Sequence, residues 1–153
     1  IDVFVTAITY KVNVEDLFHL DLAYSPPYST TKDPVMYTGM ILDNVISKGR
    51  PVITAKELDQ LTHSGQKHTV IDTRVSEQYE KGHVEEAENI PHEKIREATE
   101  KLDKNDVVVT YCNKGTTGNA AQNILQRKGF DKVYNLSGGY KQYSAEHCQK
   151  ENK

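Results

Sequence analysis

The stretch VVVTYCNKGTTGNAAQ, from Val107 to Gln122, decides the fold because it joins an apolar segment, a glycine-bearing loop and a helical segment. Val107–Tyr111 is rich in β-branched residues and apolar on both faces, which is typical of a central strand in a parallel sheet. The segment after the loop has the pattern of a helix that begins at Thr116. The stretch is therefore a β–α unit, and Cys112 lies where its strand ends.

The chain from residue 51 to residue 153 repeats this alternation of strand and helix. Repeated β–α units imply an α/β fold in which a parallel sheet is covered by helices on both faces. The expected strands are 69–71, 87–90, 107–111 and 132–136; the expected helices follow a Thr54–Glu57 capping box, run from a Ser76 cap to near Gly82, surround 95–101 and span 116–128.

Residues 1–50 differ from the rest, because they show short helical patterns on either side of a turn-rich bridge. Asn13 is expected to cap the helix in NVEDLFHL, and Asp33-Pro34 to begin a second helix, since proline tolerates the first helical position. Two such helices bury little by themselves. We therefore expect a helical segment that is left from a larger domain and needs a partner surface, followed by a second domain over residues 51–150. Because the chain starts at Ile1, inside an apolar pattern without a cap, we also expect a piece cut from a longer chain or a cleaved product.

The composition is that of an ordinary globular protein, with 27% charged and 37% hydrophobic residues. A net charge of −3 gives no broad attraction to nucleic acid or to an anionic membrane. No apolar run approaches the roughly 18 residues of a membrane span. Cys112 and Cys148 form no disulfide framework, so we expect a reducing, cytoplasmic setting.

The position of Cys112 favours a reactive thiol. In parallel sheets, functional sites form beyond the carboxyl ends of the strands. Backbone N–H groups of the loop and of the following helix N-terminus would favour negative charge on the sulfur, and the thiolate is the nucleophilic form of cysteine. Gly115 allows a positive φ in the loop. Lys114, Thr116 and Thr117 add a positive charge and hydroxyl donors. The alternative is a buried, inert cysteine at a strand end.

Two other chemistries are disfavoured. A phosphatase of the Cys-x5-Arg type needs an arginine six residues after its nucleophile to bind phosphate with two hydrogen bonds, and Gly118 occupies that position. A zinc site is not expected, because Cys112 and Cys148 have no CxxC partner and no suitably spaced histidine. No metal is therefore expected.

Several ordered motifs resemble those of the rhodanese-like sulfurtransferases. TYCNKGTTGNAAQ resembles the active-site loop, which in one large branch of the family is Cys-x-x-Gly-x-Thr before a helix. IDTRVSEQYEKGHVEEAENIP resembles the family's Asp-x-Arg strand end, its acidic tyrosine-bearing helix and its Gly-His and Asn-Ile-Pro stretches. LSGGYKQY resembles the closing Gly-Gly motif, with Tyr143 at an aromatic position. The resemblance covers about residues 52–146.

The resemblance implies a ping-pong transfer of sulfur through Cys112. Its thiolate would attack a sulfane sulfur, hold it as a persulfide and pass it to an acceptor thiol or to cyanide. Backbone N–H groups of Cys112–Thr117 would cradle the persulfide. The partners would be a small-molecule sulfur donor and a thiol acceptor, with coenzyme A persulfide as one candidate. The substrate-binding loop would comprise Asn113, Lys114, Gly115, Thr116, Thr117 and Gly118.

Individual positions refine this picture. Lys114 and Thr117 match loop positions that the family uses to bind anionic donors or to support the sulfur. Asn113 departs from the arginine found there in thiosulfate-using members, which argues against efficient use of thiosulfate. Asp72 and Arg74 are expected to support the site by bracing neighbouring loops rather than to act in catalysis, because a carboxylate–guanidinium pair at a strand end can hold two segments together.

The first segment resembles a different family. IDVFVTAITYKVNVEDLFHLDLAYSPPYSTTKDPV looks like the end of the C-terminal dimerisation domain of pyridine nucleotide–disulfide oxidoreductases, closest to the coenzyme A-disulfide reductase branch, some members of which carry a fused rhodanese domain. The resemblance implies a homodimeric parent protein that uses FAD and NAD(P)H. Tyr24 and Tyr28 match a region associated with the coenzyme A site; packing of amphipathic aromatics at an interface is the alternative. Without Gly-x-Gly-x-x-Gly after a strand, this chain is expected to bind neither cofactor itself.

Three functions remain open at this point. The first is a sulfurtransferase domain that delivers or accepts persulfide sulfur for a parent reductase. The second is a non-catalytic rhodanese-like module that binds a partner or senses oxidants. The third, a phosphatase, is disfavoured by Gly118.

Overall fold

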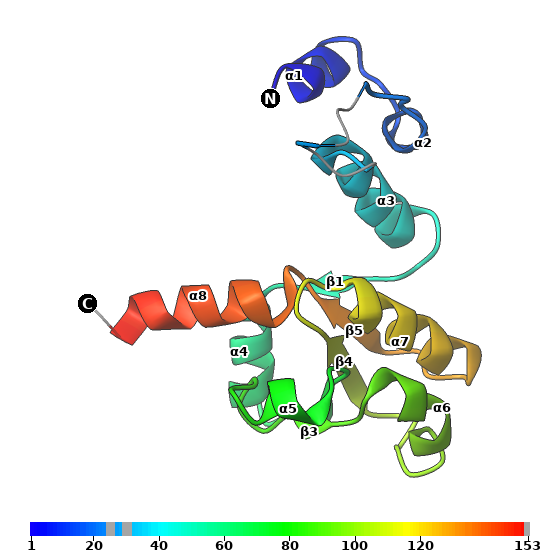
Figure 1. Cartoon of the computed structure of the whole chain (residues 1–153). Coiled ribbons are helices and arrows are strands. Elements are labelled where there is room, and N and C mark those ends of the chain that lie inside the picture. Colours follow the sequence, from blue (N-terminus) through cyan, green and yellow to red (C-terminus); the bar gives the residue numbers. More distant parts are fainter. Residues whose placement is uncertain (24–26, 29–31, 152–153) are drawn as a thin grey trace. The chain divides into compact units, whose positions relative to one another are not determined.

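The computed structural model describes residues 1–23, 27–28 and 32–151 (Figure 1). The chain divides into two compact units, Ile1–Gly49 and Arg50–Lys153, called here the N-terminal and the C-terminal unit. No helix in the described part of the chain has the length and apolar composition of a membrane span.

The C-terminal unit contains a five-stranded sheet in which every strand runs parallel to its neighbours. The strands are β1 (Val52–Ile53), β2 (His68–Asp72), β3 (Glu88–Asn89), β4 (Val107–Tyr111) and β5 (Val133–Leu136). Their order is β1-β5-β4-β2-β3, so β4 is central. Every residue of β4 is buried, as expected for a β-branched strand covered on both faces. The expected α/β fold with a parallel sheet is confirmed.

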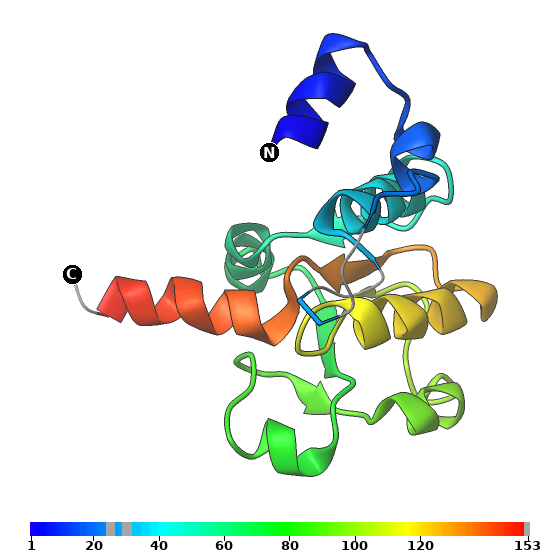
Figure 2. The ribbon, with the colours of Figure 1, turned by 45° about the horizontal axis from the view of Figure 1, so that its top comes forward.

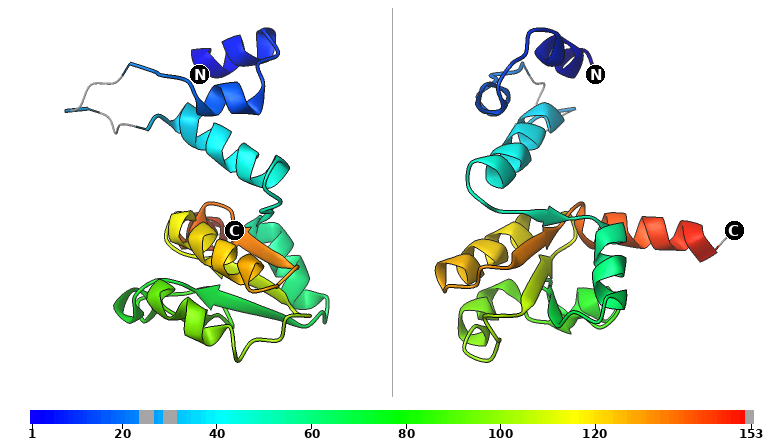
Figure 3. Two further views of the ribbon diagram at one scale, coloured as in Figure 1. Left: turned by 90° about the vertical axis from the view of Figure 1, so that its right-hand side faces the viewer. Right: turned by 180° about the vertical axis from the view of Figure 1, so that it is seen from behind.

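Helices cover both faces of this sheet (Figure 3). They are α4 (Ala55–His63), α5 (Ser76–Tyr79), α6 (Ile95–Ala98), α7 (Thr116–Arg127) and α8 (Gly139–Glu151), with a short 3-10 helix, η1 (His92–Lys94), before α6. Residues of α4, α5 and α8 pack on one face, and residues of α6 and α7 on the other. Successive residues of β4 serve both cores, since Val107 and Val109 belong to the first and Val108 to the second. The strand ends that carry the loop are therefore fixed from both sides.

Three local features of this unit differ from expectation. Ser76 does not cap α5: it is the first helical residue, its hydroxyl donates to Asn89 Oδ1 at 3.0 Å, and the helix ends at Tyr79 rather than near Gly82. Strand β1 is too short to give a periodic pattern in the sequence. Helix α8, which extends from the sheet toward the C-terminus in Figure 2, has almost no apolar periodicity to reveal it.

The described residues of the N-terminal unit form α1 (Asp2–Thr9), α2 (Val14–Phe18) and α3 (Pro34–Ile46). Asn13 is the N-cap residue of α2, where its backbone N–H donates to Asp16 Oδ2 at 3.1 Å. Asp33 caps α3 as expected, because its Oδ1 accepts a hydrogen bond of 2.7 Å from Val35 N–H. Its apolar core is small, with Ala7, Leu17 and Val35 as the buried members. The large apolar side chains that stay exposed in this unit include Ile1, Val5, Ile8, Tyr10, Tyr37, Ile41 and Ile46.

Candidate active site

Cys112 is the first residue after β4 and lies at the carboxyl end of the central strand. It keeps 7% of its surface exposed, so only a small part of it meets solvent. Helix α7 begins at Thr116, directly after Gly115, whose φ of 97° lies in the left-handed region that glycine tolerates. The loop proper is therefore Cys112–Gly115. The remaining members of the expected binding loop, through Gly118, form the first turn of α7.

Backbone N–H groups at the start of α8 hold the first two carbonyl groups of this loop. Tyr140 N–H donates to Cys112 O at 2.8 Å, and Lys141 N–H donates to Asn113 O at 3.1 Å. The carbonyl and the N–H of a planar trans peptide point in opposite directions. Because both carbonyls point toward α8, the N–H groups of Asn113 and Lys114 point away from it.

The carbonyl of Gly115 is held from the opposite side. It accepts the N–H of Asn119 at 2.8 Å, which is the first hydrogen bond of α7, and the Nδ2 of Asn135 on β5 at 3.1 Å. By the same peptide geometry, the N–H of Thr116 points outward from the helix N-terminus. The N–H groups that follow the three held carbonyls, together with the positive end of the helix, are the groups of this loop that could stabilise an anion.

Gly118 is a packing position in this structure. It is buried, and Thr110 Oγ1 donates to its carbonyl at 2.9 Å. A Cβ at Gly118 would lie 2.9 Å from Tyr111 Cα and would collide with Asn135 Oδ1. No side chain fits here, so the arginine that a Cys-x5-Arg phosphatase needs would disrupt the packing of α7 on β4 and β5.

Asp72 and Arg74 form a buried ion pair beside the loop. Arg74 Nε donates to the two carboxylate oxygens of Asp72 at 2.9 and 3.0 Å, and Nη2 donates to Gly82 O at 2.7 Å. The guanidinium carbon lies 4.3 Å from the centre of the Tyr140 ring, within the range of a cation–π contact. Burial by itself would lower the pKa of Arg74, but the hydrogen bonds and negative charge of Asp72 outweigh it and raise the pKa. The pair thus joins the end of β2 to α8.

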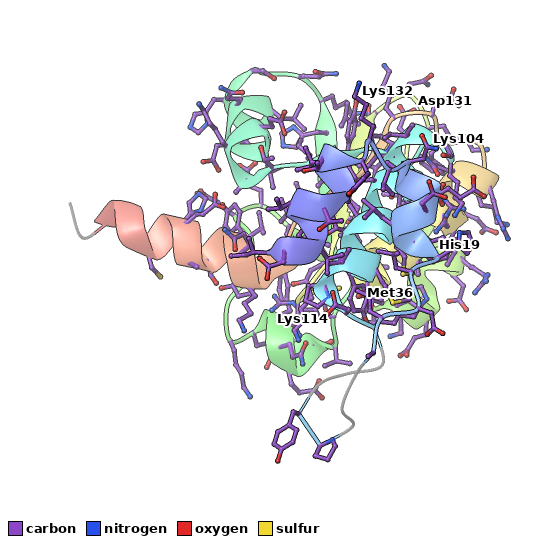
Figure 4. The ribbon with its side chains drawn as sticks, turned by 90° about the horizontal axis from the view of Figure 1, so that it is seen from above. His19, Met36, Lys104, Lys114, Asp131 and Lys132 are labelled. Carbon is purple, nitrogen blue, oxygen red and sulfur yellow. The ribbon has the colours of Figure 1, made fainter. Side chains whose placement is uncertain are left out.

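The side chains of the exposed loop residues differ in how they are held. Asn113 bridges two neighbours: its Oδ1 accepts from Arg74 Nη1 at 3.3 Å, and its Nδ2 donates to Gln78 Oε1 of α5 at 2.9 Å. Lys114, which Figure 4 labels, is exposed. Thr116 is exposed and Thr117 half-buried in the first turn of α7. The loop therefore presents one neutral amide, held in place, and one cationic side chain.

Four residues that contact the loop or its supports are not predicted from the sequence. They are Gln78, Tyr111, Asn135 and Tyr140. Tyr111 lies beneath the Asp72–Arg74 pair and accepts a hydrogen bond of 3.1 Å from Val84 N–H. Burial raises the pKa of its hydroxyl, and the Asp72 carboxylate raises it further. The one available signal was Asn135, a polar side chain inside the apolar strand VYNL.

The other candidate positions are not part of the loop. Tyr24 is outside the described residues, and Tyr28 is 89% exposed. Cys148 is exposed on α8. No group of three or more potential metal ligands occurs among the residues that the structure describes. The surface hollows beside β3 and α6, lined by residues such as Glu88 and Lys101, contain no loop residue.

The contact between α8 and the loop predicts a specific effect of Gly139→Ala. A Cβ at this position would collide with Cys112 O and lie 2.8 Å from Asn113 C, and the φ of 62° is strained for alanine. We expect a loss of about 3 kcal/mol in the free energy of unfolding, from left-handed strain and overpacking together. We also expect slower alkylation of Cys112 by iodoacetamide at neutral pH.

Gly65→Ala is the matched control. Gly65 has a φ of 72° and nothing within 4 Å of a Cβ, so this variant adds only the strain of about 1 kcal/mol. Denaturant unfolding and Cys112 alkylation measure both effects. Equal stability losses and equal alkylation rates in the two variants would contradict the contact.

Comparisons with known proteins agree with the fold and the loop. The family model of the rhodanese-like domain matches residues 54–146. The thiosulfate sulfurtransferase PspE of Escherichia coli is 46% identical over 70 residues, which cover 44% of this chain and 67% of that protein. The thiosulfate sulfurtransferase GlpE of Coxiella burnetii is 33% identical over 78 residues, which cover 51% of this chain and 73% of that protein.

Two longer solved structures match both units. The reduced CoADR-RHD of Bacillus anthracis covers 97% of this chain with a TM-score of 0.86 and 32% identity. An NAD-dependent persulfide reductase from A. fulgidus covers 93% with a TM-score of 0.76 and 31% identity. This chain spans 26% and 25% of their lengths, about a quarter of each. The family match includes β4, Cys112 and α7, and the chain belongs to the rhodanese-like domain family.

Proposed function

We propose that this domain is a sulfurtransferase that carries a sulfane sulfur atom as a persulfide on Cys112. The observation that supports the proposal best is the orientation of the loop peptides, whose carbonyls are held by α8 and by Asn135. This orientation leaves N–H groups to stabilise negative charge at the sulfur of Cys112 and at a second sulfur bound to it. The two relatives named thiosulfate sulfurtransferase are consistent with such chemistry.

The first half-reaction takes sulfur from a donor R–S–SH. The Cys112 thiolate attacks the outer sulfur of the donor, a new S–S bond forms at Cys112 Sγ, and the donor's own S–S bond breaks. The electron pair of that bond leaves on the thiolate R–S⁻. Backbone N–H groups of the loop would stabilise the thiolate before attack and the persulfide after it.

The second half-reaction returns the protein to its starting state. An acceptor thiolate attacks the outer sulfur of the Cys112 persulfide, and the electron pair of the cleaved S–S bond returns to Sγ. No external oxidant or reductant is needed, because each S–S bond that breaks is replaced by another. Cys112 performs both steps, as expected for ping-pong transfer.

We propose that the loop favours a donor whose reacting end carries at most one negative charge. The position after Cys112 carries a neutral amide held by Arg74 and Gln78, and Lys114 supplies the positive side chain of the loop. Thiosulfate carries two negative charges next to the sulfur that is transferred, whereas a persulfide group carries one at most, and the phosphate charges of coenzyme A persulfide lie at the other end of that molecule. We propose that persulfides of small thiols, coenzyme A persulfide among them, are better donors than thiosulfate.

We further propose that the domain serves a flavin-dependent coenzyme A-disulfide or persulfide reductase. The likeness of both units to the CoADR-RHD protein and the persulfide reductase supports this. The exposed apolar side chains of the N-terminal unit would then pack within that homodimeric protein. FAD and NAD(P)H would be held elsewhere in it.

Sulfur loading tests the proposal. The wild-type chain incubated with polysulfide should gain the mass of one sulfur atom, measured on the intact protein. Cys112→Ser should gain none, and Cys148→Ser, which removes the exposed thiol of α8, should load like the wild type. Loading should be reversed by an added acceptor thiol.

Two outcomes would favour the alternatives. An unmodified Cys112 after exposure to polysulfide, thiosulfate and coenzyme A persulfide would support a non-catalytic module that binds a partner or senses oxidants. Release of phosphate from aryl phosphates would support a phosphatase, against the packing of Gly118.

Asn113→Arg tests the basis of donor choice. The new guanidinium could pair with a dianionic donor, and charge-assisted hydrogen bonds of this kind are worth about 1.5–3 kcal/mol. We expect kcat/KM for thiosulfate to rise about tenfold or more, and kcat/KM for a persulfide donor to change little.

Asn105→Arg is the control for net charge, because Asn105 is exposed and precedes the amino end of β4. It makes the same substitution at the far end of the strand. A similar gain with thiosulfate in both variants, or no gain in Asn113→Arg, would show that this loop position does not set donor choice.

A further inference from the structure

Asn135 is a buried polar residue on the face of β5 that α7 covers. It is 7% exposed and lies in the last strand, 20 residues after the loop glycine that it contacts. Its Nδ2 donates to Gly115 O at 3.1 Å, while its Oδ1 has no hydrogen-bond partner in the described part of the chain. A buried acceptor without a partner costs about 1–3 kcal/mol. The amide therefore has a free-energy cost that an apolar side chain of the same shape would avoid.

The orientation of this amide follows from its surroundings. The carbonyl of Gly115 can only accept, so the NH₂ end must face it. The oxygen end then faces Gly118, which has no side chain, and a Cβ there would collide with it. Gly118 thus makes room for the Asn135 side chain, and Asn135 directs its donor to the loop.

Gly115 needs such a partner because of its own freedom. Its φ of 97° belongs to one of several backbone conformations that are open to glycine. The peptide between Gly115 and Thr116 can therefore rotate more easily than it could after any other type of residue. If that peptide turned over, its carbonyl would point toward the sulfur of Cys112 and its N–H away. A carbonyl oxygen beside a thiolate or persulfide is repulsive, whereas an N–H is attractive.

We infer that Asn135 is a positioning residue, which locks the Gly115–Thr116 peptide so that its N–H, rather than its carbonyl, faces the sulfur of Cys112. The inference rests on the proposed role of Cys112 as the sulfur carrier. The hydrogen bond from Asn119 N–H starts α7, and the bond from Asn135 ties that helix start to the sheet. Asn135 acts through the loop backbone and does not itself touch the donor.

Two variants in a Cys148→Ser background test the inference. Asn135→Leu removes the donor without adding charge, and Asn135→Asp keeps the shape but replaces the NH₂ by a second oxygen. For each we measure the pH profile of Cys112 alkylation by iodoacetamide and the melting temperature. Because the thiolate is the reactive form, we expect alkylation at pH 7 to slow about tenfold and the profile to move to higher pH.

Gln122→Leu is the matched control. Gln122 is a second buried amide in the same unit; its Nε2 donates to Pro51 O at 2.8 Å and to Val133 O at 2.9 Å, and its Oε1 also lacks a partner. Its bonds do not involve the loop. We expect it to lower the melting temperature comparably and to leave the alkylation profile of Cys112 unchanged.

The results separate this inference from the proposed function. If either Asn135 variant folds and keeps the wild-type profile, or if Gln122→Leu shifts the profile equally, the inference is wrong. Alkylation needs no sulfur donor, so a wild-type protein that fails to load sulfur would refute the transfer proposal while the alkylation comparison still tests Asn135. A shifted profile together with normal wild-type loading supports both.

Discussion

The arrangement of this site depends on two backbone hydrogen bonds between α8 and the loop. Tyr140 N–H donates to the carbonyl of Cys112, and Lys141 N–H donates to the carbonyl of Asn113. They join segments nearly thirty residues apart, and they set the direction in which the loop peptides present their N–H groups. Their short reach requires Gly139, since a side chain there would collide with the loop. The start of α8 therefore fixes the orientation of the loop peptides, although none of its side chains needs to touch a donor.

The remaining supports act on the same loop from other directions. The Asp72–Arg74 pair is buried and reaches both Gly82 and Asn113, so it links the ends of β2 and β4 through charged groups. Removing one partner would leave an uncompensated buried charge, which typically costs about 3–5 kcal/mol. Asn135 supports the helix side of the loop. Each carbonyl that is held in this way is one that cannot turn toward the sulfur of Cys112.

The sequence was informative where one local pattern determines structure. The β-branched run of β4 and the Thr54–Glu57 capping box formed as expected, because the residues that favour each are neighbours in the sequence. The Cys112 loop was likewise visible from Gly115 and the helix pattern after it. The residues that support the loop could not be predicted. Asn135, Tyr140 and Gln78 are far from it in the sequence, and no periodic pattern connects them with it. Ser76 is a case in which a local pattern gave a wrong prediction. It is a suitable cap residue, but its hydroxyl donates a hydrogen bond to Asn89 instead.

The central claim is that loop N–H groups face the sulfur of Cys112, and amide proton chemical shifts measure this most directly. Spectra of the same sample before and after sulfur loading should show downfield shifts of the Asn113, Lys114 and Thr116 amides, because these would bind the persulfide. The Tyr140 and Lys141 amides, which already donate to loop carbonyls, should keep their shifts. Unchanged shifts at the three loop amides of a fully loaded protein would contradict the account.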